Sequence, residues 1–342
     1  MSGPAGSADP AARVLRLFGG KWIAAAVSTA SSLGIPDVLA EGALSLEDLA
    51  SRIACDSNSL ERLLRVLQGE DLVRQNGTRE FELTAAGQLL RSGQLGELAQ
   101  FMGAPFGWAP WSRLPHAVRT GEAAFEAHFG LGLFDYLDQD EHKDEAALYH
   151  AAIDSFSRAE SRALAAAFDF SQVERVVDIG GGRGGLLVDV LTKWPRLSGL
   201  LVERPAAVAQ AEALFREEGI ADRCETMTAN FFEELPESAD VLVLKHIIHT
   251  WDDLTSIELL RRCADVVGPE GTLLVIEGLL LPGGRANLTS LLDLEMLVLC
   301  GPGHERSKPN MRRLLHASGL RLQKTIPLAE SAHLFVTKVR SE

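Results

Sequence analysis

The pattern of apolar and polar positions changes near residue 174 of the 342-residue chain. Beyond that point, short runs rich in Val, Leu and Ile alternate with helical stretches, which is typical of a parallel sheet with helices on both faces. We therefore predict a doubly wound, Rossmann-like α/β domain with seven strands. The runs expected to form strands are RVVDIG, SGLLVE, CETMT, VLVLKH, GTLLVIEGLL, LRLQKTI and HLFVTKV.

The segment near the N-terminus is mainly helical in pattern. Residues 11–40 predict an apolar helix followed by a shorter helix that ends near Gly42. Small and apolar residues recur one turn apart in the first helix, which predicts one buried face. That face carries Trp22, Ala26, Ala30 and Leu33.

Residues 45–92 predict two helices and a hairpin. Ser45 stands three residues before Asp48, close to a capping box at a helix start. Asn76-Gly77 is typical of a tight hairpin turn. Helix, helix and hairpin in this order indicate a winged helix, which either binds DNA or forms a scaffold for dimerisation.

The charge of the chain favours dimerisation. The formal net charge is −14, and the second helix sets Arg62 and Arg65 beside several acidic residues. A protein that binds nucleic acid or an anionic membrane surface needs a positive face. We therefore expect a scaffold for dimerisation, with neither nucleic acid nor membrane as a partner.

The chain has the features of a cytoplasmic protein. Its first residues lack the apolar core of a signal peptide. No apolar run reaches the roughly 18 residues of a membrane span. The four cysteines are far apart, which predicts free thiols rather than disulfides or a zinc site.

Residues 98–136 are rich in aromatic side chains, and long helices are expected up to about residue 168. Such side chains are mostly core, although an apolar substrate pocket uses the same types. We predict a winged-helix-like dimerisation domain at 1–100, a helical linker that contributes to a substrate pocket at 101–168, and the Rossmann-like domain at 169–342.

A glycine-rich loop, DIGGGRGG, joins the first expected strand to a helix. Gly180, Gly182 and Gly185 fit the G-x-G-x-x-G pattern of nucleotide-binding loops, including those for NAD. Asp178 is awkward beside a pyrophosphate but suits the cationic ammonium of S-adenosylmethionine (SAM). Glu203, about 20 residues on, can accept hydrogen bonds from ribose hydroxyls in either cofactor.

Polar and aromatic residues follow the third expected strand. The Asn230 amide can bond an adenine edge, and the Phe231 ring can pack on it. Strand ends in a doubly wound sheet face the ligand crevice, so both residues are candidates for the cofactor site.

A histidine follows the fourth expected strand. His249 is a candidate general base, because its side chain titrates near neutral pH. Glu277 ends the fifth strand and could hold one imidazole nitrogen, as the third group of a triad does. Glu305 is a second candidate for that role, and His246 has no evident role.

Together these motifs resemble the plant caffeate-type O-methyltransferases and their bacterial relatives that modify antibiotic scaffolds. The resemblance spans residues 176–307, and the winged-helix pattern fits that family's dimerisation domain, which implies a homodimer. The matching motifs, in order, are DIGGGRG, LLVERP, ANFFEELP, LKHIIHTWDD, LLVIE and DLEMLVLCGPGHERS.

The resemblance implies a SAM-dependent O-methyltransferase that acts on a hydroxyl of a small aromatic natural product, with S-adenosylhomocysteine (SAH) as product and no metal. It implies that His249 is the base and that Glu277 and Glu305 flank it. The residues expected at the cofactor are Ser157, Asp178, Gly180, Gly182, Glu203, Asn230, Phe231, Lys245 and Trp251. Those expected at the acceptor are Trp108, Phe125, Phe156, Asp293 and Met296.

Several positions depart from the family pattern. Glu203, Asn230 and Thr250 stand where the family usually has Asp, and Pro302-Gly303-His304 replaces Gly-Gly-Lys. Alternatives stay open at this point: methylation of carbon or nitrogen, non-methylating chemistry such as hydroxylation, an NAD-dependent oxidoreductase, and a winged-helix regulator with a ligand-sensing domain.

Overall fold

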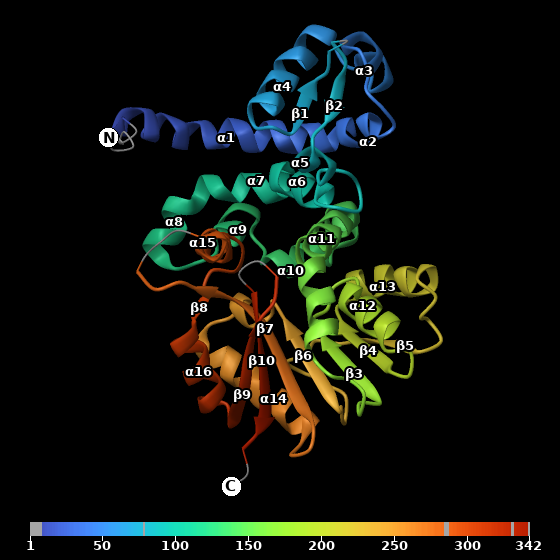
Figure 1. Cartoon of the computed structure of the whole chain (residues 1–342). Helices are drawn as coiled ribbons and strands as arrows, with labels where there is room; N and C mark the ends of the chain where they lie inside the picture. Colours follow the sequence, from blue (N-terminus) through green and yellow to red (C-terminus); the bar gives the residue numbers. More distant parts are fainter. Residues whose placement is uncertain (1–8, 78, 284–286, 330–331, 341–342) are drawn as a thin grey trace, which may run out of the picture. The chain divides into compact units, whose positions relative to one another are not determined.

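The computed structural model describes residues 9–77, 79–283, 287–329 and 332–340. The chain forms two compact units, Met1–Trp108 and Ala109–Glu342, whose elements are labelled in Figure 1. None of the helices in the described segments has the length and apolar character needed to cross a membrane.

Unit 1 has the predicted winged-helix order. Its elements are α1 (Pro10–Ser32), α2 (Ile35–Ala40), α3 (Leu46–Arg52), α4 (Ser57–Gly69), β1 (Val73–Gln75), β2 (Phe81–Leu83), α5 (Ala85–Gln88), α6 (Gly96–Gly103) and α7 (Pro105–Trp108). The β1 and β2 strands pair antiparallel. The predicted cap is present: the Ser45 hydroxyl accepts from the Asp48 N–H at 3.1 Å.

The buried face of α1 differs from the prediction. Ala26 and Ala30 are buried, but Trp22 is 70% exposed and Leu33 is 38% exposed. The apolar face predicted from spacing is therefore wrong at its two large residues. Small residues pack against α6, where Gly103 lies against the Ser28 side chain. Close helix contact selects small side chains there and leaves the large ones in solvent.

Unit 2 begins with short helices. These are η1 (Ala109–Arg113), α8 (Leu114–Thr120), α9 (Ala124–Phe129), α10 (Leu133–Leu137) and η2 (Asp140–His142), followed by the 25-residue α11 (Lys143–Ala167). The expectation of long helices is therefore correct for α11 and wrong before it. Glycines in the left-handed region follow α8 and α9, at Gly121 and Gly130, and stop each helix.

The sheet of unit 2 contains all seven predicted strands. They are β3 (Arg175–Ile179), β4 (Ser198–Glu203), β5 (Cys224–Thr228), β6 (Val241–Lys245), β7 (Thr272–Leu280), β9 (Leu320–Pro327) and β10 (Ala332–Val339). Their order is β5-β4-β3-β6-β7-β10-β9, and the two-residue β8 (Arg306–Ser307) pairs with β7. The β10 strand runs antiparallel to β7 and β9, so the sheet is mixed rather than fully parallel.

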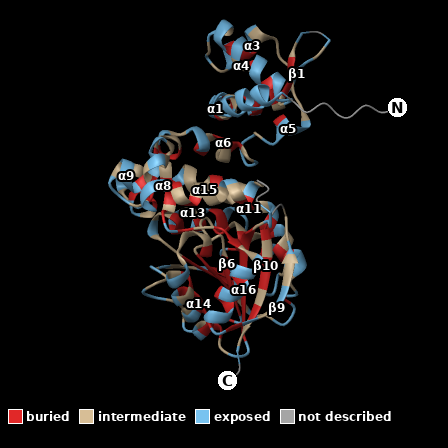
Figure 2. Ribbon diagram, turned by 90° about the vertical axis from the view of Figure 1, so that its left-hand side faces the viewer, coloured by how far each residue is buried: buried red, intermediate tan, exposed pale blue. Residues whose placement is uncertain are grey.

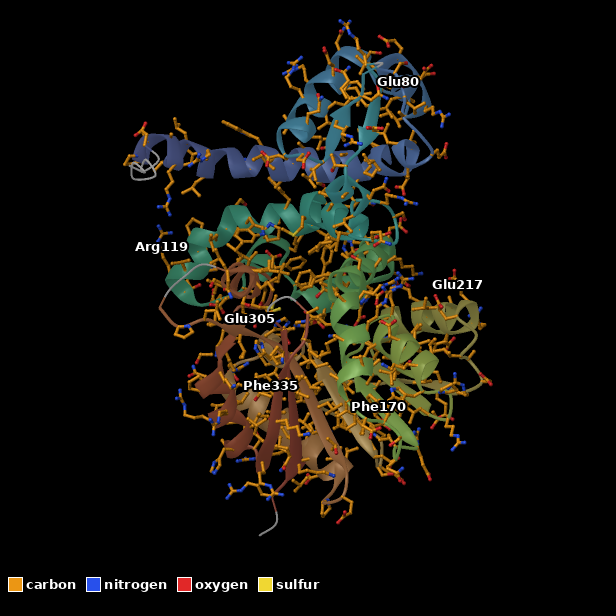
Figure 3. All side chains as sticks on the ribbon, in the orientation of Figure 1. Glu80, Arg119, Phe170, Glu217, Glu305 and Phe335 are labelled. Atoms are coloured by element: carbon orange, nitrogen blue, oxygen red, sulfur yellow. The ribbon has the colours of Figure 1, made fainter. Side chains whose placement is uncertain are left out.

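Helices cover both faces of this sheet. One face packs on α14 (Asp253–Val267) and α16 (Lys308–Ala317), and the other packs on α12 (Gly185–Lys193), α13 (Pro205–Glu217) and the end of α11. Figure 2 shows that buried residues concentrate in the strands. In Figure 3, Phe335 lies within the sheet, whereas Glu305 lies beyond the strand ends, beside α15 (Leu288–Cys300).

The strand order creates a crevice at one edge of the sheet. The β4 and β6 strands lie on opposite sides of β3 and run parallel to it. The connections after β3 and after β5 therefore lead to opposite sides, and such a switch point is where doubly wound sheets bind ligands. The residues that follow β3, β4, β5 and β6 meet there.

Candidate active site

A cavity of about 470 Å³ lies at this crevice, within unit 2. Residues at the ends of β3, β4, β5 and β6 line one side of it, and residues of α10 and α11 line the other. Its volume is within the usual range for a small-molecule site. The residues predicted for the cofactor that line it are Ser157, Gly180, Gly182, Glu203, Asn230, Phe231, Lys245 and Trp251.

The glycine loop forms the floor of the cavity. Gly180 and Gly182 have φ of +67° and +59°, a region that glycine adopts without strain. A Cβ on Gly180 would collide with the Ile247 side chain. Backbone, rather than side chain, thus faces the cavity and gives a ligand close access.

Two polar side chains follow β4 and β5. Glu203 accepts from the Gly182 N–H at 3.3 Å and from the Arg204 N–H, so it ties the glycine loop to β4. Burial raises the pKa of Glu203 to about 7. The side-chain oxygen of Asn230 accepts from the Phe232 N–H at 3.1 Å, which fixes the turn that carries Phe231 to the cavity wall.

Asp178 does not line the cavity. Its side chain is fully buried beneath the glycine loop, where a Cβ on Gly181 would meet it. Neither carboxylate oxygen has a hydrogen-bonding partner among the described residues. Burial raises its pKa to about 7, against the opposing charge of Lys245.

Lys245, the last residue of β6, reaches across to α11. Its ammonium donates to the Ser157 hydroxyl at 2.6 Å and to the Ser161 hydroxyl at 3.0 Å. Both serines are buried. The contact therefore fixes α11 against the end of the sheet and places Ser157 at the cavity wall.

Aromatic side chains line the side of the cavity near β5 and β6. The Phe231 and Phe232 rings lie 5.0 Å apart, and Phe232 meets Trp251 edge to face at 4.8 Å. Such flat apolar surfaces suit a heteroaromatic ring. The cavity thus combines a backbone cradle, an acidic residue and an aromatic wall.

His249 lies in η3 (Ile248–Thr250), which begins three residues after the end of β6 at Lys245. Its Nδ1 contacts Glu305 Oε1 at 2.8 Å and lies 3.6 Å from Glu277 Oε2. Glu277 also accepts from the Ile248 N–H at 2.7 Å. The two carboxylates hold Nδ1, and no hydrogen bond engages Nε2 among the described residues.

Both carboxylates favour the protonated imidazole. Burial alone would lower the pKa of His249, but the Glu277 charge and the Glu305 hydrogen bond outweigh it and raise the pKa to about 9. Burial raises the pKa of Glu277. Burial acts in the same direction on Glu305, but the hydrogen bond between Glu305 and His249 outweighs it and brings the pKa of Glu305 below the usual value. The site therefore stabilises the imidazolium that forms when His249 accepts a proton.

Arg306, which the sequence did not single out, fixes the segment that carries His249. Its side chain is fully buried and donates to the backbone oxygens of Ile248 and Trp251 at 2.8 and 2.9 Å. It also pairs with Asp253 at 2.8 Å. Its position next to Glu305 could have indicated this role in the sequence, because one short segment supplies both the carboxylate that holds His249 and the arginine that fixes the backbone around it.

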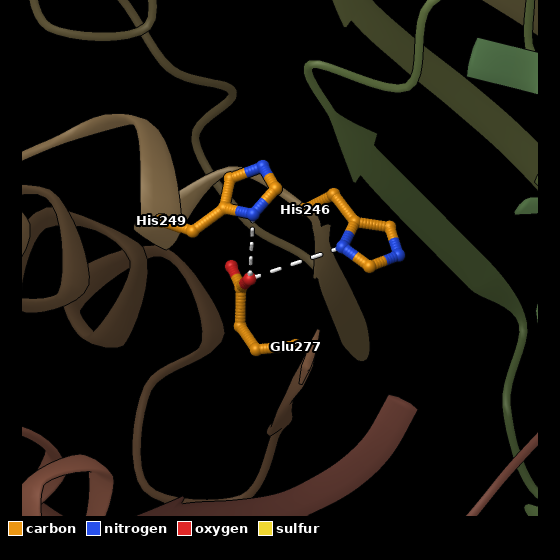
Figure 4. A group of neighbouring side chains, drawn as sticks. All are labelled: His246, His249 and Glu277. Atoms are coloured by element: carbon orange, nitrogen blue, oxygen red, sulfur yellow. Dashed lines mark ion pairs between the residues drawn. The ribbon is translucent and has the colours of Figure 1, made fainter. Parts of the chain in front are cut away.

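His246 also belongs to this cluster. Figure 4 shows His246 and His249 on either side of Glu277. The donor atoms of these three residues lie within 4.8 Å of one another and are of types that can bind a metal ion, although the sequence predicts no metal. Because Glu305 already holds His249 Nδ1, we interpret the cluster as a site for proton transfer.

The residues predicted at the acceptor are dispersed. Phe125 is fully buried and packs against Phe129 at 4.8 Å, as a core residue does. Asp293 accepts from the Glu305 N–H at 2.7 Å, so it supports the base. The Phe156 ring lies 6.4 Å from His246, Met296 is buried in α15, and Trp108 ends unit 1.

Two of the departures from the family pattern have clear positions. Thr250 lines the cavity, and its hydroxyl donates to the Ile247 carbonyl at 2.7 Å. His304 is 41% exposed and faces Asp253 at 3.6 Å. The change at residue 250 therefore affects the cavity wall, whereas the change at residue 304 does not.

The chain belongs to the O-methyltransferase family, since residues 111–321 match its O-methyltransferase domain and residues 15–93 match its dimerisation domain. It is a SAM-dependent O-methyltransferase. It is 38% identical over 317 residues to the mitomycin biosynthesis 6-O-methyltransferase of Streptomyces lavendulae, which covers 90% of this chain and 88% of that protein.

Solved structures agree with this assignment. The crystal structure of LaPhzM has a TM-score of 0.89 and 32% identity, and covers 97% of this chain and all of that one. An O-methyltransferase of neocarzinostatin biosynthesis, solved with SAM and 2-hydroxy-5-methyl naphthoic acid, has a TM-score of 0.74 and 29% identity, with 92% and 95% covered. Family members bind SAM in this fold.

Relatives with other chemistry are also similar. The 8-amino-8-demethylriboflavin N,N-dimethyltransferase of Streptomyces davaonensis is 34% identical and covers 84% of each chain. The aclacinomycin 10-hydroxylase RdmB of Streptomyces purpurascens is 30% identical and covers 87% of this chain and 81% of that one. Proteins similar to this chain are therefore named for nitrogen methylation and hydroxylation as well as for O-methylation.

Proposed function

We propose that this enzyme methylates a hydroxyl group of a small aromatic natural product, with His249 as general base. The observation that carries the proposal is the buried contact between His249 Nδ1 and Glu305 Oε1 at 2.8 Å. It leaves Nε2 able to take a proton from an acceptor. Relatives that are named for phenazine and for naphthoate acceptors support a flat aromatic acceptor.

The residues of the cavity fit SAM. The glycine loop gives the close backbone approach that a side chain would block. Glu203 would accept from ribose hydroxyls, while Asn230 and Phe231 would hold the adenine ring. Ser157 and Lys245, which line the same cavity, would hold the methionyl end. Asp178, behind the loop, would add negative charge near the ammonium without touching it.

Bound SAM supplies a methyl group already activated by its sulfonium, so the carbon–sulfur bond breaks as the carbon–oxygen bond forms. The protein has to align the acceptor and remove its proton. Alignment can supply much of the rate. His249 Nε2 takes the hydroxyl proton, which typically contributes about 10²–10⁴-fold. Glu277 and Glu305 stabilise the resulting imidazolium, and Asp293 fixes Glu305.

Unit 1 would form a homodimer through α1. Leu15, Phe18 and Trp22 follow one another at helical spacing and are 64% to 70% exposed. Such a row of large apolar side chains is costly in water and is typical of an interface. The match of residues 15–93 to the dimerisation domain supports this proposal. The expected protomer contact is thus between copies of unit 1.

Nitrogen methylation is the second candidate, since one relative is named for it. An amine attacks with its neutral lone pair and loses its proton only after the carbon–nitrogen bond has formed, so it needs a base less than a hydroxyl does. The buried pairing of His249 with two carboxylates therefore favours a hydroxyl acceptor. The same pairing disfavours hydroxylation, which does not call for a base at this position.

The test begins with the cofactor. Calorimetry with SAM, SAH and NAD should show binding of the first two and none of NAD; the reverse would overturn the proposal. Product formation is then measured by mass spectrometry with 1,4-dihydroxy-2-naphthoic acid, a hydroxyphenazine and 3-amino-4-hydroxybenzoate, and NMR locates the new methyl. EDTA should leave the rate unchanged.

His249→Ala should lower the rate by about 10²–10⁴-fold with little change in SAH affinity. The exposed His128 of α9 provides the matched control, since His128→Ala should behave as the unmodified enzyme. Full activity of His249→Ala, or a new methyl on nitrogen alone, would refute hydroxyl methylation by this base.

A further inference from the structure

His246 has an unusual backbone conformation. Its φ of +56° lies in the left-handed region, which few residues other than glycine adopt. It comes directly after β6, and its N–H still bonds the Ile276 carbonyl at 2.9 Å. The chain therefore turns sharply at His246, and contacts with neighbouring residues hold its side chain in place.

The imidazole of His246 is held by α11. Its Nε2 lies 2.6 Å from Glu160 Oε2, and the side chains are only 9% and 5% exposed. A contact this short between two buried titratable groups is typical of a charge-assisted hydrogen bond. A buried carboxylate without a partner is costly, and His246 Nε2 is the group that meets Glu160.

The other nitrogen of His246 faces the base. Its Nδ1 lies 3.9 Å from Glu277 Oε2, and neither atom has a hydrogen-bonding partner among the described residues. The His246 and His249 rings are 5.3 Å apart. A positive charge on His246 thus acts on both Glu277 and His249, and solvent screens it little because all three side chains are largely buried.

We propose that His246 is a positioning residue of the methyl transfer: held by Glu160, its imidazolium shares the charge of Glu277 and so keeps His249 available to accept the acceptor's proton. This inference rests on the proposed function of His249. Glu277 and Glu305 together would bind a proton on His249 too firmly. The charge of His246 offsets the charges of these carboxylates, so His249 loses its proton at a lower pH than it would without His246.

All the charged groups around His246 enter this balance. Glu160 of α11 and Glu277 of β7 stabilise its charge, while His249 competes for Glu277. Lys245 precedes it and is turned to the serines of α11. Glu305 and the buried Arg306 lie beyond His249 and act on it with opposite signs. Removal of His246 leaves the carboxylates with one cation fewer.

The first test needs no acceptor. Protein labelled with ¹³C in its nine histidines is saturated with SAH and titrated by NMR, and the His249 signal is assigned by its loss in His249→Ala. His246→Asn keeps a residue that tolerates positive φ but carries no charge. It should raise the apparent pKa of His249 by about one to two units. An unchanged or lower value would overturn the inference.

The matched control is His316→Asn, an exposed histidine of α16, which should leave the His249 titration unchanged. SAH affinity by calorimetry should stay within about threefold for both variants. If His246→Asn fails to fold, Glu160→Gln is the second variant, and it should raise the apparent pKa of His249 in the same direction, by a smaller amount. No effect of Glu160→Gln would overturn the role of Glu160.

Kinetics separate this inference from the proposed function. His246→Asn should lower kcat/KM about tenfold or more at neutral pH, and less at high pH, with KM for SAM nearly constant. In a His249→Ala background it should have no further effect, because His246 acts through His249. Multiplicative losses would indicate a merely structural role. Full activity of His249→Ala alone would refute the base itself.

Discussion

Replacement of Arg306 by methionine tests whether one buried side chain fixes the segment that carries the base. A methionine side chain would fill part of the volume of the arginine stem but donate no hydrogen bond. The backbone oxygens of Ile248 and Trp251, now bonded at 2.8 and 2.9 Å, would lose their charged donor. The Ser256 hydroxyl, at 3.3 and 3.5 Å from them, would compensate weakly.

The magnitude follows from these contacts. Each buried acceptor that loses its donor costs about 1–3 kcal/mol. The pair with Asp253 adds little, because that carboxylate is 63% exposed. Removal of a desolvated guanidinium offsets part of the cost. We therefore expect Arg306→Met to lower the free energy of unfolding of unit 2 by about 3 kcal/mol. The loss of a fixed η3 should also lower kcat about tenfold or more.

Urea denaturation followed by tryptophan fluorescence measures this loss. The transition that SAH moves to higher urea belongs to unit 2, since the cavity lies there. Arg313→Met, on the exposed face of α16, is the matched control and should stay within about 0.5 kcal/mol. A loss below about 1 kcal/mol for Arg306→Met, or an equal loss for the control, would refute the reasoning.

Further predictions concern the base, the cofactor and the glycine loop. The pKa of His249 is raised from 6.5 to about 9, so the protonated side chain stabilises the folded protein fully below pH 6.5 and loses this effect as the pH rises to about 9. Urea titrations across this range should show the free energy of unfolding decline by up to about 1.4 kcal/mol per pH unit. His249→Gln should abolish this decline. Glu203→Ala should weaken SAM binding by calorimetry about tenfold or more, while kcat at saturation changes little. Gly184→Ala should destabilise unit 2 by about 1–3 kcal/mol in thermal unfolding, because φ is +80° and a Cβ would lie 2.5 Å from the Phe215 ring.

Each of these has a result that contradicts it. A flat stability profile in the unmodified enzyme would remove the case for a strongly paired His249. Unaltered SAM affinity in Glu203→Ala would place the ribose elsewhere. Gly132, with φ of −62° and open space around it, is the control for the glycine test; equal losses at both positions would show that packing at Phe215 is not the cause.

The sequence predicts the sheet well for a physical reason. Strands buried on both faces are continuous apolar runs, and β4 has the expected bounds. Most residues predicted for the cofactor line one cavity, because parallel strand ends converge on one edge. The local sequence pattern is sufficient to predict a residue's position wherever that position depends only on the strand that the residue follows.

The sequence fails where distant segments meet. Glu160 and His246 are 86 positions apart, and Arg306 and Ile248 are 58 apart. Nothing in the local pattern of either partner indicates the contact. Trp22 fails for the converse reason: its spacing predicts burial, but within the chain small residues make the close contacts of α1. The walls of the cavity near α10 and α11 likewise depend on packing of unit 2.

The α11 helix determines where unit 2 can accept insertions and deletions in its sequence. It places Tyr149, Ile153 and Ser157 along the cavity wall, one turn apart, and then Glu160 and Ser161 against the end of β6. One inserted or deleted residue would rotate all later side chains by about 100° and shift them by about 1.5 Å. We therefore expect this helix to accept substitutions, and insertions or deletions to be accepted only in the loops outside it.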